Sequence, residues 1–180
     1  MRHETLKVAP SLTLHLDADA FTVTEVTATT LRDTDEAPLA EVRLTDYREP
    51  DWLVPQVELD FRLDNVRTVV KARLHVQRNG THNRPLVLDG HALETTAIRI
   101  DGVGVAAWPN GDMLTLPITG DSAVVETEVV IHPQRNTRLM GLYASEGRLV
   151  TQCEAEGFRS ITWFPDRPDV LSRYTVRLES

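Results

Sequence analysis

The sequence predicts an all-β fold, a mostly antiparallel, sandwich-like domain that follows an N-terminal extension. Two observations predict it. Apolar and polar residues alternate with a period of two in several segments, which is typical of strands with one buried face. Turn-forming pairs such as Asn79-Gly80, Asp101-Gly102 and Asn110-Gly111 separate these segments. No segment carries the i, i+3, i+4, i+7 pattern of a long amphipathic helix.

The expected strands follow one another along the chain. In the first, residues 57–63 alternate apolar with charged side chains, and residues 70–76 repeat the pattern. His75 falls on the polar side of the second strand, so we expect it to be solvated. Further strands are expected within residues 97–100, 113–118, 123–131 and 174–178.

The first 46 residues differ in composition from the rest. They hold four basic and nine acidic residues, so they carry five of the eight net negative charges of the chain. We therefore predict an acidic N-terminal arm over residues 1–45, either disordered or folded as a hairpin, because Leu12, Leu14 and Leu16 alternate with polar residues. Residues 46–180 form the predicted β domain.

Composition also limits the partners. The chain has a net charge of −8 and a pI near 5.2, and it carries no basic stripe, so we expect no nucleic acid as partner. No stretch approaches the roughly 20 apolar residues that span a bilayer, so we expect no membrane partner. The single cysteine, Cys153, and the lack of a signal-peptide core predict a cytoplasmic protein.

The common catalytic and metal-binding motifs are absent. The six histidines form no HExxH, and there is no CxxC, so the sequence predicts no metal ligand and no catalytic residue. No histidine stands near Cys153 in the sequence. We therefore expect Cys153 to be a small buried side chain rather than a nucleophile.

One short segment, "TQCEAE" at residues 151–156, carries polar residues that suit a cationic ligand. In an extended chain Gln152, Glu154 and Glu156 would share one side, and Cys153 and Ala155 would face the core. An amide and carboxylates together suit an ammonium group, which offers three donors and a positive charge. The alternative is that these are ordinary surface acids, paired with Arg148 or Arg159.

The same segment lies within a longer stretch that resembles a known family. "GLYASEGRLVTQCEAEGFRSITWFPDRPDVLSRYTVRLE", together with "DYREPDWLVPQVELDFRLD" and "RPLVLDGHALE", resembles the N-terminal domain of bacterial aminopeptidase N, a zinc-dependent gluzincin. The resemblance covers roughly residues 46–180. It implies a saddle-shaped, mostly antiparallel β domain that closes one side of the active-site cleft of a thermolysin-like catalytic domain.

The resemblance also implies roles for two residues. Glu154 matches the family glutamate that binds the free α-amine of a peptide substrate, and Gln152 matches the glutamine that lines the pocket for the first side chain. Glu156, Arg159 and residues 166–169 match loop-forming positions. Peptide N-termini and the catalytic domain of the same enzyme are the partners that this implies.

The family's zinc motif is absent from these 180 residues. The chain is therefore expected to hold no cofactor and to be inactive alone, with zinc in the catalytic domain. Two alternatives remain open, a freestanding β-sandwich binding module and a non-catalytic scaffold. Tyr143, Trp163 and Phe164 flank the key segment, and we expect them on an exposed apolar face where the catalytic domain docks, with a place in the core as the alternative.

Overall fold

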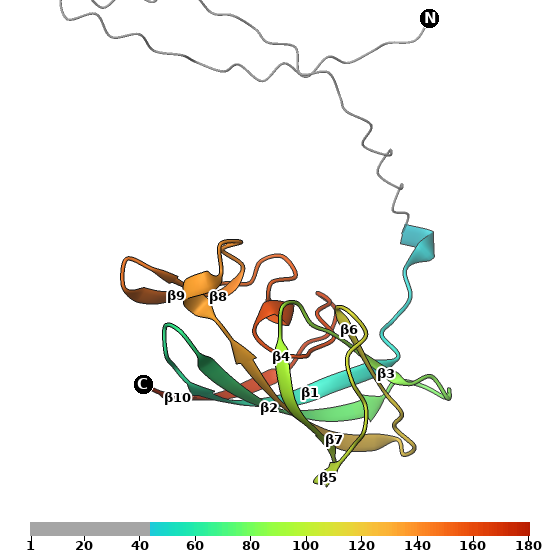
Figure 1. The fold of residues 1–180 in the computed structure, drawn as a ribbon. Helices are drawn as coiled ribbons and strands as arrows, with labels where there is room; N and C mark the ends of the chain where they lie inside the picture. The colour runs from blue at the N-terminus through green and yellow to red at the C-terminus, as the bar shows by residue number, and fades with distance from the viewer. Residues whose placement is uncertain (1–43) are drawn as a thin grey trace, which may run out of the picture. The chain divides into compact units, whose positions relative to one another are not determined.

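The computed structural model describes residues 44–180 of the chain (Figure 1). The chain divides into two units, Met1–Tyr47 and Arg48–Ser180. In the first unit the structure describes a short 3-10 helix, η1 (Leu44–Asp46). The predicted N-terminal arm, residues 1–45, lies almost wholly outside the described residues and stays a prediction.

The second unit is built on a twisted six-stranded sheet (Figure 1). Its strand order is β10-β1-β2-β7-β4-β5. The strands are β1 (Trp52–Arg62), β2 (Thr68–Arg78), β4 (Glu94–Ile100), β5 (Val103–Gly104), β7 (Ser122–Ile131) and β10 (Arg173–Glu179). All neighbours pair antiparallel except β1 and β10, which are parallel. The prediction of an all-β, mostly antiparallel fold is thus confirmed.

Two small sheets complete this unit. β3 (Leu86–Asp89) pairs with β6 (Met113–Leu116), and β8 (Gly141–Ser145) pairs with β9 (Arg148–Gln152). Two further 3-10 helices, η2 (Pro133–Arg135) and η3 (Phe158–Ser160), lie next to β8 and β9 in the chain. The inward leucines of β3 and β6 are fully buried and belong to the same core cluster as the large sheet. One core therefore holds the small sheets against the large one.

The two faces of the large sheet differ as the alternation predicts. On the inner face Val57, Val70 and Leu74 have no exposed surface, because period-two spacing turns them all toward the core. On the outer face charges pair across neighbouring strands, as Lys71 does with Glu128 at 3.5 Å. Within residues 44–180, no helix is long and apolar enough to cross a membrane.

Two aromatic residues correct the sequence prediction. Trp163 and Phe164 are 2% and 3% exposed, so the expectation that they form an apolar docking face is wrong. The indole Nε1 of Trp163 donates to Thr95 Oγ1 at 2.9 Å, and the ring covers Gly90 so closely that a Cβ there would lie 2.3 Å away. Phe164 exchanges two backbone hydrogen bonds with Asp89. These contacts anchor the loop that follows η3 to the core, whereas Tyr143 is half-buried.

Candidate functional site

The predicted site lies in a tight turn at the end of a hairpin. β8 and β9 are joined by Glu146 and Gly147, both at positive φ, as a two-residue hairpin loop requires. The strand β9 ends at Gln152, and residues 154–157 then turn back toward η3. The N–H of Gly157 donates to the carbonyl of Cys153 at 2.8 Å, which closes the turn.

This geometry corrects the expected extended segment. Residues 154–157 form a turn and do not continue the alternation of β9, and Glu156 has a φ of 59°. Ala155 is consequently exposed and does not face the core, and only Cys153 is partly buried. The sequence does carry one signal for the turn, which is Gly157. A Cβ at that position would lie 2.7 Å from Cys153 Cα and 2.8 Å from the Gln152 carbonyl oxygen, so only glycine fits without movement.

The turn brings the two predicted binding residues together. The side-chain Nε2 of Gln152 donates to the main-chain carbonyl of Glu154 at 2.9 Å. Both residues are exposed. Among residues 44–180, no group hydrogen bonds or forms an ion pair with the carboxylate of Glu154. The loop therefore displays a carboxylate whose hydrogen-bonding capacity is available, while the Gln152 amide bonds the backbone of the same residue.

Glu156 behaves differently from Glu154. Its carboxylate lies 3.4 Å from Arg159 Nη2, which is the surface pairing that the sequence allowed as an alternative. Arg159 also binds Asp166, through its side-chain Nε at 3.1 Å and its backbone N–H at 3.0 Å. Partial burial lowers the pKa of Arg159, but the hydrogen bond to Asp166 and the charges of Asp89 and Glu156 outweigh it and raise that pKa. These residues hold the loop in shape.

Asp166 connects this network to the core sheet. Its backbone N–H donates to Asp89 Oδ2 at 3.1 Å. Farther along the loop, Arg167 forms a bidentate pair with Asp169 and donates to the Arg48 carbonyl at 2.7 Å. The segment that follows the turn is thus braced by backbone and side-chain bonds to segments distant in the sequence.

Cys153 lies between the two candidate residues, and its environment is that of a structural side chain. Burial raises the pKa of its thiol, and the negative charge of Asp166 raises it further. The thiol therefore stays protonated at neutral pH, whereas a nucleophilic cysteine needs a lowered pKa.

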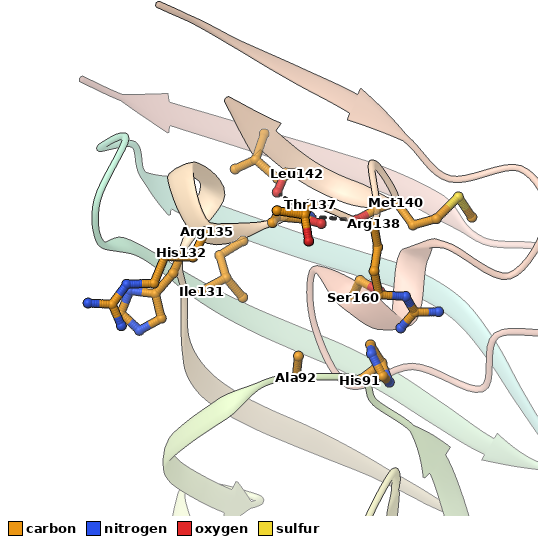
Figure 2. A pocket seen from close by; sticks show the side chains of 11 residues that line it. His91, Ala92, Ile131, His132, Arg135, Thr137, Arg138, Met140, Leu142 and Ser160 are labelled. Carbon is orange, nitrogen blue, oxygen red and sulfur yellow. Dashed lines mark hydrogen bonds between the residues drawn. The ribbon is translucent and has the colours of Figure 1, made fainter. Parts of the chain in front are cut away.

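A hollow of about 310 Å³ that no sequence pattern predicted opens near η2 and β8 (Figure 2). The residues that line it are His91, Ala92, Ile131, His132, Arg135, Asn136, Thr137, Arg138, Met140, Leu142 and Ser160. The Asn136 amide donates to the Met140 and Leu142 carbonyls at 2.7 and 2.9 Å, which holds the rim in shape. Gln152 and Glu154 do not line this hollow.

Two histidines at the hollow are hydrogen bonded to acids outside it. The imidazoles of His91 and His132 lie 3.1 and 3.4 Å from the carboxylates of Asp112 and Glu94. We assign the hollow no ligand.

No cluster of side chains within residues 44–180 has the ligands that a zinc site needs. Among these residues, His, Cys, Asp and Glu side chains form no cluster of three or more that could hold a metal. The donor set of a protein zinc site, three or four such ligands around one point, is not met here.

Comparison with known proteins relates the chain to bacterial aminopeptidase N. The chain is 51% identical to aminopeptidase N of Caulobacter vibrioides over 142 residues, which is 77% of this chain. It is 39% identical to aminopeptidase N of Escherichia coli over 144 residues, 79% of this chain. Most of the chain is homologous to part of bacterial aminopeptidase N. The match spans only 16% of the length of each of these aminopeptidase N relatives.

Solved structures agree with this homology. Legionella pneumophila aminopeptidase A, crystallised with aspartic acid, is 29% identical with a TM-score of 0.69, over 76% of this chain and 17% of that one. Native yeast LTA4 hydrolase is 18% identical with a TM-score of 0.60, over 71% of this chain and 23% of that one, and supports the fold alone. A comparison with models of protein families gave no match.

Proposed function

We propose that residues 46–180 are the substrate-recognition part of the N-terminal domain of a zinc aminopeptidase. In this role the domain closes one side of the active-site cleft, Glu154 binds the free α-amine of the peptide, and Gln152 lines the pocket for the first side chain. The observation that carries the proposal is the exposed carboxylate of Glu154, which no group among the described residues pairs, on a turn whose main-chain carbonyl at Glu154 accepts a hydrogen bond from the Gln152 amide. The homology to aminopeptidase N supports it.

The chemistry of exopeptidase recognition gives Glu154 its role. A free N-terminus differs from an internal peptide bond by one positive charge and three N–H donors. A carboxylate at the place where the ammonium binds therefore selects the correct substrate and orients it for reaction. Such a carboxylate must be accessible and must not be neutralised by an arginine of the same domain. Glu154 meets both conditions, whereas Glu156 is paired with Arg159.

Other parts of the reaction belong to partners of this domain. We propose that a catalytic domain of the same enzyme supplies the zinc ion, since residues 44–180 offer it no ligand cluster. The peptide N-terminus is the substrate group that this chain itself contacts. We further propose a cytoplasmic location, which the single cysteine supports.

The test uses a chimaera in which residues 46–180 replace the matching segment of Caulobacter vibrioides aminopeptidase N. Glu154→Gln keeps the shape of the side chain and removes its charge. Loss of a charge-assisted contact costs about 1.5–3 kcal/mol, so we expect kcat/KM for an aminoacyl substrate to fall about ten- to a hundredfold. The melting temperature is expected to stay within about 1 °C, because exposed substitutions change stability little.

Glu156→Gln is the matched control, two residues away in the same turn. It removes only an exposed ion pair with Arg159, which is worth at most about 1 kcal/mol of stability, so kcat/KM should change less than about threefold. Near wild-type kcat/KM in Glu154→Gln, or a larger loss in Glu156→Gln, would refute the assignment of Glu154.

A further inference from the structure

Asparagine or aspartate stands directly before glycine at four places in the chain, and such pairs can react with themselves. The pairs are Asn79-Gly80, Asp89-Gly90, Asp101-Gly102 and Asn110-Gly111. Glycine has no Cβ, so its peptide nitrogen is little hindered in approaching the side-chain carbonyl of the residue before it. Aspartate is ionised at neutral pH, and an ionised carboxylate resists attack by a nucleophile more than a neutral amide does. By chemistry alone the two asparagines are therefore the more reactive residues.

The structure holds Asn79 away from its glycine. The side-chain Nδ2 of Asn79 donates to the Pro50 carbonyl at 2.8 Å and lies 3.5 Å from a carboxylate oxygen of Glu49. Its backbone N–H donates to the Asp51 carbonyl at 2.9 Å. The side chain must leave these partners before the nitrogen of Gly80 can attack it, so the reaction has to wait for local opening of the chain.

The two aspartate pairs are engaged in a similar way. The Asp89 carboxylate accepts a backbone N–H from the loop after η3 at 3.1 Å. The nitrogen that would attack it, that of Gly90, donates its own proton to the Asp112 carbonyl at 2.9 Å. The Asp101 carboxylate accepts the N–H of Val124 at 2.8 Å. Both aspartates are thus protected by structure as well as by charge.

Asn110 differs from the other three residues. It is exposed, and among residues 44–180 neither its side-chain amide nor the N–H of Gly111 forms a hydrogen bond. Gly111 has a φ of 60°, and a Cβ added to it would meet no atom within 4 Å, so this turn projects into open space. Only the backbone of Asn110 is paired, with Met113, by hydrogen bonds of 2.8 and 3.3 Å. The carbonyl under attack and the attacking nitrogen are therefore both accessible and unengaged.

We propose that Asn110 is a modification site, which deamidates through attack of the Gly111 nitrogen on its own side chain. A bond forms between Gly111 N and Asn110 Cγ, and the bond from Cγ to the side-chain nitrogen breaks. The leaving nitrogen takes up the proton that Gly111 N loses, so it departs as ammonia. Water then opens the cyclic succinimide at one of its two carbonyl carbons. One opening gives aspartate, and the other gives isoaspartate, in which the main chain runs through the former side chain.

The two products differ in their effect on the fold, because the turn is tied to the end of β3. The Asp112 carbonyl accepts the N–H of Gly90, and the Asp112 carboxylate lies 3.1 Å from Nδ1 of His91. Gly90 in turn lies under the ring of Trp163. Isoaspartate at position 110 lengthens the main chain by one methylene in a two-residue turn, so the backbone pairing across the turn loses its register. Aspartate at this position keeps the length of the main chain and changes only the charge.

The experiment incubates the folded 180-residue chain in mildly alkaline buffer, where the Gly111 nitrogen loses its proton more readily. Each of the four pairs is followed by digestion and mass spectrometry, and isoaspartyl methyltransferase labels the isoaspartate product. We expect Asn110 to be converted at least about tenfold faster than Asn79, because Asn79 reacts only after local opening. In the urea-unfolded chain the two asparagines should react at rates within about twofold of each other, since both precede glycine and neither is held by structure.

Two variants separate the reaction from its consequences. Asn110→Gln should stop the conversion, because its longer side chain would have to close a less favourable six-membered ring, and it should abolish any loss of melting temperature on incubation. Asn110→Asp carries the charge of the product without the longer main chain, so it should melt within about 1 °C of wild type before incubation. The isoaspartate fraction of the incubated wild-type chain should melt several degrees lower.

Equal conversion of Asn110 and Asn79 in the folded chain would overturn the proposal, as would faster conversion at Asp89 or Asp101. An Asn110 that stays intact in the folded chain and reacts only after unfolding would also overturn it, and would show that the pairing with Met113 protects the turn. None of these outcomes bears on Glu154, whose role is tested separately by kcat/KM of Glu154→Gln.

Discussion

Gly157 allows a direct test of how the turn positions the site, through the substitution Gly157→Ala. Its φ of −94° is ordinary for any residue, so the substitution adds no backbone strain of its own. The added Cβ would lie 2.7 Å from Cys153 Cα and 2.8 Å from the Gln152 carbonyl oxygen, whereas ordinary contact begins at 3.4 Å. Both neighbours are backbone atoms, so the turn itself must open by roughly 0.7 Å to admit the methyl group.

The expected cost follows from this overlap. Overpacking of this kind destabilises a protein by about 1–3 kcal/mol, which corresponds to a fall of about 2–12 °C in melting temperature for a domain of this size. Opening the turn also lengthens the 2.8 Å hydrogen bond from Gly157 to Cys153 and displaces Glu154. Since small displacements of a positioning group are costly in catalysis, kcat/KM of the chimaera should fall about tenfold or more.

Gly104 provides the control for this test. It lies on the short strand β5, where an added Cβ meets no atom within 4 Å and φ is outside the left-handed region. Gly104→Ala should therefore keep or slightly raise the melting temperature, by scanning calorimetry, and leave kcat/KM unchanged. If Gly157→Ala melted within 1 °C of wild type and retained full kcat/KM, the turn would not be the tight, position-setting element described above.

Three further outcomes are expected. Deletion of residues 1–45 should change the melting temperature by less than about 2 °C, because the described hydrophobic core runs from Trp52 to Val170. A drop of about ten degrees would show that the arm adds to the core. The purified 180-residue chain should hold no stoichiometric zinc by metal analysis and cleave no aminoacyl reporter, since the sequence contains no HExxH; one tightly bound zinc per chain would contradict this. Cys153 should react with iodoacetamide more slowly at pH 7 than in the urea-unfolded chain, because burial raises its thiol pKa above the ordinary 9.0; equal rates would disprove that burial. The same raised pKa means that the folded state holds this proton more tightly, so the thiol's contribution to stability is present below pH 9 and declines as pH rises beyond it.

The sequence alone determined the strands of the large sheet, apart from the two-residue β5, and the family to which the chain is similar. Alternation at Val57, Leu59 and Phe61, and again at Val70 and Leu74, predicted buried faces correctly, because the period-two pattern is a local property of an extended chain. The sequence also placed Gln152 and Glu154 next to each other in a polar segment, and the structure joins them through a hydrogen bond.

Only the tertiary structure decided which carboxylate stays unpaired and which aromatic side chains are buried. Glu154 and Glu156 look equivalent in an extended segment, but the turn directs Glu156 to Arg159 and leaves Glu154 exposed. Trp163 is buried because Gly90, 73 positions earlier in the chain, leaves room for its ring. β10 lies at the edge of the large sheet because it pairs with a strand more than a hundred residues away. Pairings between distant segments depend on how the whole chain packs, and no local pattern encodes them.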